Sequence, residues 1–359
     1  MKKILGVTLV VLLMLAAYLL AWPVPIEPQP WTPAPAPKLE GAYAKNELLK
    51  KAELIAAGLG RGPEGVALDA QGRVYAGFDD GRVYRFAADG TQPVQLANTG
   101  GRPLGTLARP DGSVVVADAE KGLLRIAGDG AVTVLSSTAD GVPFRFTDDV
   151  DAGTQSPVLY FTDASSRFGI HATMADVLEH APNGRVLAYD PASGTTQVVV
   201  RDLYFPNGIA VGPDDAFFLV NETTTYRILR HWLKGEKAGQ TEVFADNLPG
   251  FPDNISFNGR DRFWCAIYSP RVADLDRFLP LPFVRKIVFR LPAAAQPRPA
   301  HFGMALGFNV DGQVVANLQG TGEGAYAPVT SVEEHDGWLY FGSLSAPSLA
   351  RLRLGDALR

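Results

Sequence analysis

GPEGVALDAQGRVYAG (62–77), RPLGTLARPDGSVVVAD (102–118) and FPNGIAVGPDDAFFLVNE (205–222) share the pattern that decides the fold. Each begins with a short lead-in that contains proline, continues as a run of apolar residues, turns at Asp and Gly, and ends in a second apolar run. Short apolar runs separated by such turns indicate paired β-strands rather than helices. Further copies of the pattern occupy 145–163, 250–268 and 328–343.

Six copies in a chain of 359 residues predict an all-β fold, a six-bladed β-propeller. A β-sandwich is the rival, but six repeats of similar size do not suit two packed sheets. In a propeller the first strand of each blade lines a central channel, so the lead-ins meet at one mouth of that channel. The residues expected to converge there are Glu64, Leu104, Asp148, Asn207, Asp253 and Thr330.

Composition excludes several classes of protein. With 47% hydrophobic and 20% charged residues, the chain is neither disordered nor collagen-like. The net charge of −5 argues against a nucleic-acid partner, which would require a clustered basic face. The single Cys265 excludes an intramolecular disulfide framework and a zinc site built from several cysteines.

The N-terminal segment 1–22 predicts a membrane-spanning signal anchor. Ile4 to Trp22 carries no charge, and about 20 apolar residues in a helix cross the hydrocarbon core of a bilayer. A cleaved signal peptide is the alternative, but its apolar region is shorter, and Ala21-Trp22-Pro23 makes a poor cleavage site. Lys2 and Lys3 precede the span, which leaves the N-terminus in the cytoplasm and the rest of the chain outside it. A bacterial inner membrane facing the periplasm fits the composition, and an endomembrane lumen is the alternative.

Residues 23–44 are expected to form a linker, and 45–359 the propeller. Seven prolines lie between Pro23 and Pro37, a density that favours polyproline II and a semi-rigid spacer. The stretch 45–57 leads into the propeller, part helix and part first strand. These divisions predict one domain held off a membrane by a stalk.

Two insertions interrupt the strand pattern. The first, 167–182, has helical character, and the second, 271–290, is aromatic, apolar and basic. Insertions in repeat folds gather as loops on one face, often the binding face, so we expect a cap over a substrate pocket lined by Leu104, His171, Phe283 and Thr330. Surface decoration is one alternative, and 278–289 lying against the membrane is another.

The lead-ins carry oxygen ligands at equivalent positions of different blades. Glu64, Asp148, Asn207, Asp253 and the neighbouring Asn254 offer only carboxylate and amide oxygens, which suit Ca²⁺ best, with Mg²⁺ or Mn²⁺ as alternatives. Taken singly, each of these residues is an ordinary turn former beside Gly or Pro. Their recurrence at one place in the repeat favours a metal site in the channel.

The motifs GPEG, PNGIA, FPDNI and VEEHDGWLYFGS, in this order, resemble the strictosidine synthase-like group of the gluconolactonase and senescence-marker-protein propellers. The run NETTTYRILRHWLKGEKAGQTEVFADNLPGFPDNI (221–255) is especially similar to the adipocyte plasma-membrane-associated branch, whose members also have an N-terminal signal anchor. The resemblance covers the chain from about residue 50 onward. It implies a six-bladed propeller with a divalent metal, usually calcium, and in many members hydrolysis of lactones or aryl esters.

Carried over by the resemblance, the metal ligands fall on Glu64, Asn207 and Asp253, with Asn254 beside them. Asp148 stands where the family has Asn, which adds a negative charge that tightens a hard cation or serves as a base. Asp149 matches an acidic position near the substrate.

Two departures narrow the function that the resemblance implies. The catalytic Glu of strictosidine synthases is replaced by Thr330, four residues before Glu334, which argues against the alkaloid-forming condensation. The channel-facing His of paraoxonases is replaced by Leu104, which removes a His base.

The sequence therefore predicts a metal-dependent hydrolase of lactones or aryl esters. The cation would polarise the carbonyl, and Asp148, Asp149 or Asp253 would deprotonate the attacking water. The alternative is a non-catalytic, membrane-tethered binding propeller with a structural metal, which the missing His and Glu favour.

Overall fold

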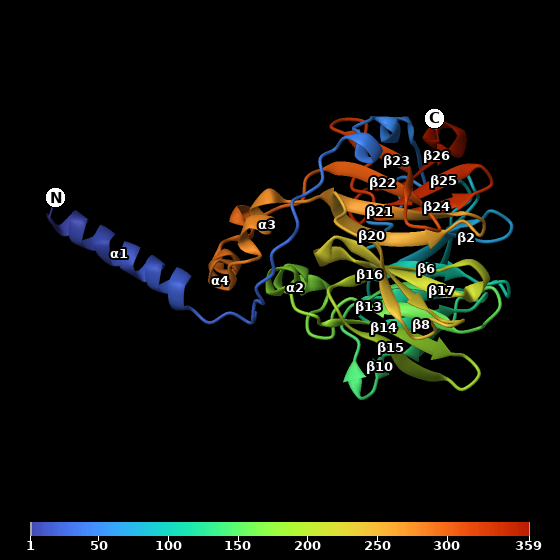
Figure 1. The fold of residues 1–359 in the computed structure, drawn as a ribbon, viewed down its shortest axis with the longest axis horizontal. Helices are drawn as coiled ribbons and strands as arrows, with labels where there is room; N and C mark the ends of the chain where they lie inside the picture. The colour runs from blue at the N-terminus through green and yellow to red at the C-terminus, as the bar shows by residue number, and fades with distance from the viewer. Residues whose placement is uncertain (1, 359) are drawn as a thin grey trace.

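The computed structural model describes residues 2–358 and shows six four-stranded antiparallel sheets arranged as the blades of a propeller (Figure 1). The predicted fold is confirmed, and the innermost strands of the blades are β2, β6, β12, β16, β20 and β24. Each of these strands contacts the innermost strand of the next blade, which closes the ring around the channel.

The strands follow the chain blade by blade. The first two blades contain β2 (Val66–Leu68), β3 (Val74–Gly77), β4 (Arg82–Phe86), β5 (Val94–Asn98), β6 (Pro103–Ala108), β7 (Val114–Asp118), β8 (Gly122–Ile126) and β9 (Val132–Ser136). The next two contain β12 (Thr147–Ala152), β13 (Leu159–Asp163), β14 (Gly184–Asp190), β15 (Thr195–Leu203), β16 (Pro206–Val211), β17 (Phe217–Glu222), β18 (Arg227–Trp232) and β19 (Thr241–Ala245). The last two contain β20 (Gly250–Phe257), β21 (Arg262–Pro270), β22 (Phe302–Asn309), β23 (Val314–Thr321), β24 (Ser331–His335), β25 (Trp338–Gly342), β26 (Leu349–Arg353) and β1 (Glu53–Ile55). A small hairpin, β10 (Thr138–Ala139) with β11 (Val142–Pro143), precedes the third blade.

The last blade is completed by the first strand of the chain. β1 pairs antiparallel with β26, with Glu53 opposite Arg351 and Ile55 opposite Leu349. The Arg351 guanidinium also binds the Glu53 carboxylate at 3.0 Å. The predicted first strand within 45–57 is therefore the outermost strand of the sixth blade, and it ties the two ends of the propeller together.

The inner strands are irregular where the lead-ins reach the channel. The pairing register shifts between Pro103 and Thr106, between Thr147 and Val150, and between Pro206 and Ile209. β20 shifts in the same way between Pro252 and Ile255. Such bulges re-aim side chains, and here they fall at the residues predicted to converge.

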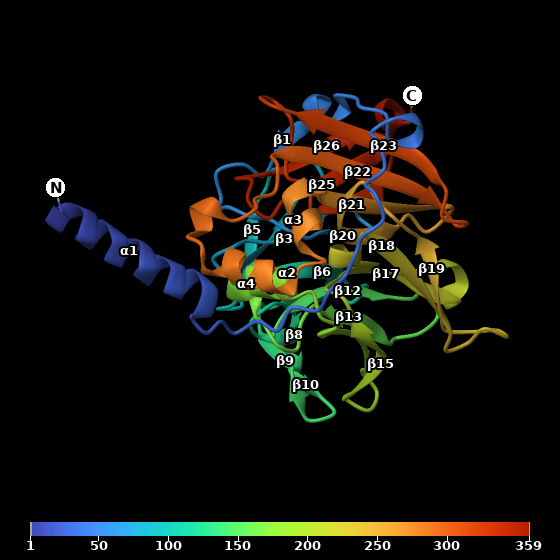
Figure 2. The same ribbon diagram turned by 60° about the vertical axis from the view of Figure 1, so that its left-hand side comes forward.

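Both insertions are helical and lie on the side of the propeller from which α1 (Lys2–Ala21) extends (Figures 1 and 2). The first holds η3 (Ile170–Ala172) and α2 (Thr173–Glu179), and the second holds α3 (Ala273–Phe278) and α4 (Pro282–Arg290). α4 packs against α1, α2 and α3. We call these helices the cap.

The remaining helices are short and lie in connections. They are η1 (Gly41–Tyr43), η2 (Leu48–Lys51), η4 (Pro213–Asp215), η5 (Thr223–Thr225), η6 (Ala293–Ala295) and α5 (Leu354–Ala357).

The proline-rich segment 23–37 lies along the cap and the propeller, whereas its composition predicts a semi-rigid spacer that holds the propeller off a membrane. The amide of Gln29 donates to Glu179 O at 3.0 Å, and that of Trp31 donates to Leu279 O at 3.2 Å. Ile26 is fully buried, and the Trp31 ring stacks on His180 with the ring centroids 4.6 Å apart. Composition predicts an extended chain correctly, but the apolar residues between the prolines pack on the protein instead of facing water. We call 23–37 the strap.

Candidate active site in the propeller channel

Four predicted residues converge at one mouth of the channel. Glu64 precedes β2, and Asp148, Asn207 and Asp253 lie on the inner strands β12, β16 and β20. All four line one cavity of about 350 Å³, and each is buried. The structure thus brings together polar side chains that are up to 189 positions apart in the sequence.

Side chains at the ends of the second strands hold these lead-ins in place. The carboxylate of Asp118 accepts a hydrogen bond from the Arg102 amide at 3.0 Å, and that of Asp163 accepts one from Phe146 at 3.0 Å. The hydroxyl of Thr162, on β13, donates to Asn207 O at 2.6 Å. The first two of these bonds lie within one blade, whereas the third joins the third blade to the fourth.

Several oxygens at this mouth have no hydrogen-bond partner. Glu64 Oε2, Asp148 Oδ2 and Asn207 Oδ1 are buried and unpaired. Leaving a buried acceptor unpaired costs about 1–3 kcal/mol, and more for a charged group. Three unpaired oxygens from three blades surround one cavity. They indicate a site for a bound group that is coordinated by oxygen atoms, such as a cation.

The electrostatics of the mouth are unbalanced. Burial raises the pKa of Glu64 to about 7, while Arg102 and a hydrogen bond from Asn254 partly oppose the rise. Burial and the Glu64 carboxylate also raise the pKa of Asp148 and of Asp253 well above the usual range. Arg102 is the basic group that opposes the rise at both Glu64 and Asp148. Three buried carboxylates beside one guanidinium carry excess negative charge, which a bound cation would offset.

The donor set fits a hard divalent cation by chemistry, since it contains only carboxylate and amide oxygens. Within residues 2–358, however, no three His, Cys, Asp or Glu side chains are grouped closely enough to enclose an ion. The carboxylates stand around the cavity rather than in contact with one another. A cation at this place therefore needs the amide of Asn207 in its donor set as well.

The walls of the cavity above these oxygens are largely apolar, although Arg298 also lines it. The cap contributes Met174 and Val177 from α2 and Leu275 from α3. The blades contribute aromatic side chains, namely Phe146, Phe205, Phe251 and Tyr268. Apolar walls over a polar floor are typical of a site for a small, largely hydrophobic ligand.

Of the four residues predicted from the sequence to line the substrate pocket, one lines the cavity and three do not. Leu104 is buried and lines the cavity. Thr330 is fully buried behind it, where its hydroxyl donates to Glu64 O at 3.0 Å. The His171 side chain is 89% exposed and binds Glu120 at 2.7 Å. Phe283 is 56% exposed on the outer face of α4. The cap covers the pocket as predicted, but with α2 and α3 rather than with the insertion residues chosen from sequence.

Asp149 faces away from the cavity that Asp148 lines, since consecutive residues of a strand point to opposite sides. Its carboxylate accepts hydrogen bonds from the amides of Val150 at 2.9 Å and Ile209 at 3.0 Å. Asn254 lies between the two sides, where its amide nitrogen donates to Glu64 Oε1 at 2.7 Å. Asp149 thus holds β16 beside β12, and Asn254 orients Glu64.

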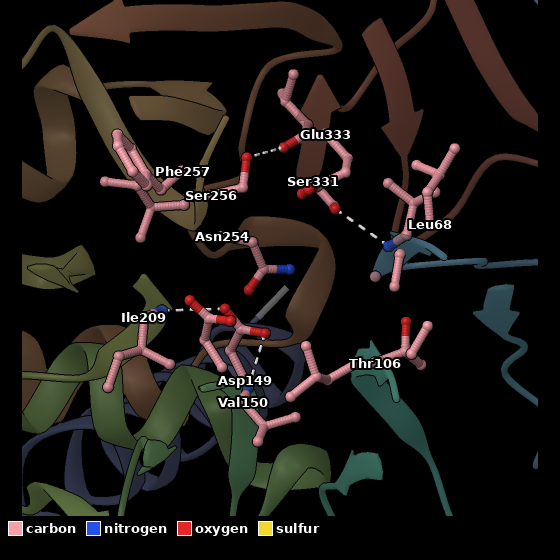
Figure 3. A pocket seen from close by; sticks show the side chains of 18 residues that line it. Leu68, Thr106, Asp149, Val150, Ile209, Asn254, Ser256, Phe257, Ser331 and Glu333 are labelled. Carbon is pink, nitrogen blue, oxygen red and sulfur yellow. Dashed lines mark hydrogen bonds between the residues drawn. The ribbon is translucent and has the colours of Figure 1, made fainter. Parts of the chain in front are cut away.

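Asp149 and Asn254 line a second cavity of about 100 Å³ farther along the channel (Figure 3). Figure 3 shows the carboxylate of Asp149 below the Asn254 amide, with Ser256 and Glu333 on the opposite wall. Burial raises the pKa of Asp151, which also lines it, to about 6, and that of Glu333 to about 8. Repulsion by Asp151 and Asp149 adds to the rise at Glu333. Acidic groups therefore line both ends of the channel.

Glu333 makes the stability of the propeller sensitive to pH. Its pKa in the folded protein, about 8, lies above its ordinary value of 4.5, so the folded state binds more protons between these pH values and stability falls as pH rises through them. We expect Glu333→Gln to raise the free energy of unfolding by about 1–2 kcal/mol at pH 9 and to leave it unchanged at pH 4. Urea unfolding at both pH values measures this, with the exposed Glu323→Gln as control. An equal effect at both pH values would contradict the prediction.

Sequence reasoning missed Arg102 and the cap residues of the cavity. Arg102 is 7% exposed, and its guanidinium donates to Gly62 O at 2.9 Å while one nitrogen stays unpaired. A basic residue directly before the Pro-Leu-Gly lead-in was the available signal. For Met174, Val177 and Leu275 there was none, because apolar residues in a short helix do not reveal which side faces a pocket.

Comparisons with known proteins agree with this fold. A family model described as strictosidine synthase matches residues 148–236, and one described as strictosidine synthase-like, N-terminal, matches residues 41–86. The chain is 36% identical over 313 residues to Protein STRICTOSIDINE SYNTHASE-LIKE 6 of Arabidopsis thaliana, covering 85% of this chain and 82% of that protein. It is 32% identical over 351 residues to the human adipocyte plasma membrane-associated protein, covering 92% and 84%.

Solved structures share the fold at low sequence identity. A gluconolactonase from Xanthomonas campestris superposes with a TM-score of 0.60 at 17% identity, covering 84% of this chain and 89% of that one. Regucalcin from Agrobacterium tumefaciens, described as a calcium-binding protein, gives a TM-score of 0.56 at 15% identity, covering 86% and 93%.

Proposed function

The chain belongs to the strictosidine synthase-like family, and we propose that it is a membrane-anchored hydrolase of lactones or aryl esters that uses a divalent cation in the propeller channel. The observation that carries this proposal is the set of unpaired buried oxygens at the floor of an apolar cavity. The gluconolactonase and the calcium-binding regucalcin that share the fold support lactone hydrolysis and a metal at the level of the fold.

The cation would be held by Glu64, Asp148, Asn207 and Asp253. Carboxylate and amide oxygens favour Ca²⁺, with Mg²⁺ or Mn²⁺ as alternatives. When bound, a divalent cation polarises a substrate carbonyl and makes a water molecule more acidic.

The protein's own residues supply the remaining parts of the reaction. Asp148 has an unpaired Oδ2 at the cavity and accepts the proton of the attacking water. Asp149 is not assigned this role, since both of its oxygens are engaged by backbone amides. Asn254 holds Glu64 through one oxygen and leaves the other free toward the cavity. The aromatic and cap side chains bind the acyl or aryl part and exclude water.

The strictosidine-type condensation is not proposed. The position that would carry its catalytic Glu is Thr330, whose hydroxyl is engaged by the backbone carbonyl of Glu64. A threonine so placed holds the first lead-in and presents no acid or base to a substrate.

The membrane anchor is assigned to α1. Lys3–Ala21 is the one helix in the described residues that is long and apolar enough to cross a bilayer, and none of it is buried against the protein. A relative named for association with the plasma membrane supports this assignment. The lysines that precede the span support an orientation with the N-terminus in the cytoplasm and the propeller outside it.

Removal of the metal tests the proposal. We expect the purified full chain, treated with chelator and dialysed, to lose at least about tenfold of its activity on a panel of lactones and aryl esters and to regain it with Ca²⁺. Removing a ligand that was present at a free concentration of 100 times its Kd lowers the free energy of unfolding by about 2.7 kcal/mol. This lowers the melting temperature by about 5–10 °C.

The two measurements separate the alternatives. A lower melting temperature without turnover on any ester or lactone would support a binding propeller with a structural metal. If the chelator changed neither turnover nor the melting temperature, both the proposed metal site and the proposed mechanism would be wrong.

A further inference from the structure

We propose that the outer face of α4, together with the adjoining end of α1, rests on the surface of the same bilayer that α1 crosses. The partner is the lipid interface, and the docking surface consists of Leu281, Phe283 and the exposed end of α1 at Tyr18 and Trp22. This inference rests on the proposed anchor and is independent of the proposed hydrolysis.

The end of α1 is bound directly to the end of α4. The Arg290 guanidinium donates to Leu19 O at 2.9 Å and to Trp22 O at 2.7 Å, and the Tyr18 hydroxyl donates to Arg290 O at 3.1 Å. The last carbonyls of a helix have no partner within the helix, and a cation there also complements the helix dipole. Arg290 therefore fixes α4 at the depth where the span ends.

Aromatic residues mark that depth. Tyr18 and Trp22 are 40% and 62% exposed, and Trp and Tyr are enriched where a membrane meets water. Because Trp22 hydrogen-bonds to Arg290, the C-terminal end of α4 lies at the interface whenever α1 spans the bilayer. Figures 1 and 2 both show α4 beside the end of α1 and on the α1 side of the propeller.

The outer face of α4 is apolar. Leu281 and Phe283 are 48% and 56% exposed, and outside α1 and Trp22 no other large aromatic side chain in residues 2–358 is this open to solvent. A buried Phe gains about 1.5–3 kcal/mol over an exposed one. An exposed Phe and Leu next to a membrane span are thus suited to the boundary between headgroups and acyl chains.

The charges around α4 are already paired within the protein. Lys286 binds Glu27 at 3.2 Å, and Arg277 binds Asp274 at 3.2 Å. Arg285 is fully buried and donates to Leu178 O and Glu179 O at 3.0 and 3.1 Å. The surface consequently attracts lipid through apolar contact, and docking does not require anionic headgroups.

The strap keeps the cap close to the membrane. If 23–37 were a free spacer, the propeller could move away from the bilayer by the length of that segment. Instead Gln29 and Trp31 are hydrogen-bonded to the cap, and Arg285 also donates to Gln29 O. Trp22 and Ile26 are only four residues apart, so the chain passes from the span to the buried strap without slack.

Site-specific probes test this docking. Cys265 is the only cysteine and is fully buried, so Phe283→Cys can be labelled with an environment-sensitive fluorophore in the full chain. The protein is reconstituted in phosphatidylcholine vesicles that contain a spin-labelled lipid as quencher. The matched control is Val243→Cys, 49% exposed on β19, which Figure 2 shows on the side of the propeller away from α1. Leu12→Cys, 56% exposed in the middle of α1, reports the span itself.

We expect the probe at 283 to be quenched by the labelled lipid at least threefold more than the probe at 243, with no change when phosphatidylserine is added. Equal quenching at 283 and 243, with strong quenching at 12, would overturn the docking and leave the anchor standing. Protection at 283 from aqueous iodide without lipid quenching would mean that a second copy covers α4, which also overturns it. If the labelled lipid did not quench the probe at 12, both the anchor and the docking would be wrong. Turnover measured in detergent would still test the proposed hydrolase separately.

Discussion

Replacing Asp253 by asparagine is expected to lower turnover of a lactone or aryl ester by about 10²–10³-fold and to weaken Ca²⁺ binding in parallel. The substitution keeps the shape of the side chain and removes its negative charge. The backbone at this position stays in place, because the buried Asn221 amide donates to Asp253 O. The loss therefore reports the carboxylate rather than a displaced strand.

The same substitution is expected to raise the stability of the metal-free protein, although it lowers turnover. Burial and the neighbouring Glu64 and Asp148 raise the pKa of Asp253, so ionising it destabilises the folded protein above its unfolded pKa. Without metal, Asp253→Asn should melt at a higher temperature than the unchanged protein at pH 8, whereas the gain on adding Ca²⁺ should disappear. Only a carboxylate that both repels its neighbours and binds a cation predicts this crossover.

Calorimetry for Ca²⁺, thermal melts with and without Ca²⁺, and ester hydrolysis measure these effects. Asp336→Asn is the matched control, because its side chain is 89% exposed in a turn of the last blade. If the Asp253 variant kept turnover within threefold of the unchanged protein, Asp253 would not take part in the reaction.

Gly208→Ala is expected to destabilise the propeller by about 3–5 kcal/mol and to abolish the site. A Cβ at this position would lie 2.4 Å from Asn254 Cα and from Ile255 N, and 2.6 Å from Asp253 O. All three atoms belong to the backbone of β20, so no side chain can turn away to make room. β16 and β20 would have to separate, which would displace Asn207 and Asp253 from the cavity.

Urea unfolding and Ca²⁺ binding measure the Gly208 variant. Gly128→Ala is the control, because a Cβ there meets no atom within 4 Å and its backbone is not left-handed. We expect that control to change the free energy of unfolding by less than about 1 kcal/mol. A similarly small change for Gly208→Ala would contradict the close approach of the two strands.

The repeat made the fold and much of the site predictable, because one pattern marks both the strand and its place in the ring. Glu64, Asp148, Asn207 and Asp253 recur at the same point of their blades, and a propeller has only one axis on which such points can meet. Asp149 shows the limit of this reasoning. Alternation predicts that neighbouring residues face opposite sides, but the bulge decides which of the two faces the cavity.

The sequence did not predict how the helices of the cap and the strap pack against one another. Helical character in 167–182 and 271–290 was evident, but the side of each helix that meets the pocket depends on packing against α1 and the strap. Phe283 looked like a pocket residue because it is aromatic, and it lies outside because Arg285 and Val288 fill the inner face of α4. Arg285 itself binds carbonyls of α2 and the strap, contacts between segments that no local pattern encodes.

The pairing of β1 with β26 also governs when this protein can acquire its native state. Glu53 and Arg351 are 298 positions apart, so the sixth sheet stays incomplete until nearly the whole propeller has been synthesised. Contacts over such separations form slowly, since a long loop must close before they contribute. Up to that moment five sheets can form while β1 waits without its partner strand, and an unpaired strand is a site for wrong pairing. Deleting β1 would therefore leave the edge of β26 permanently open, and copies of the chain would be prone to associate through it.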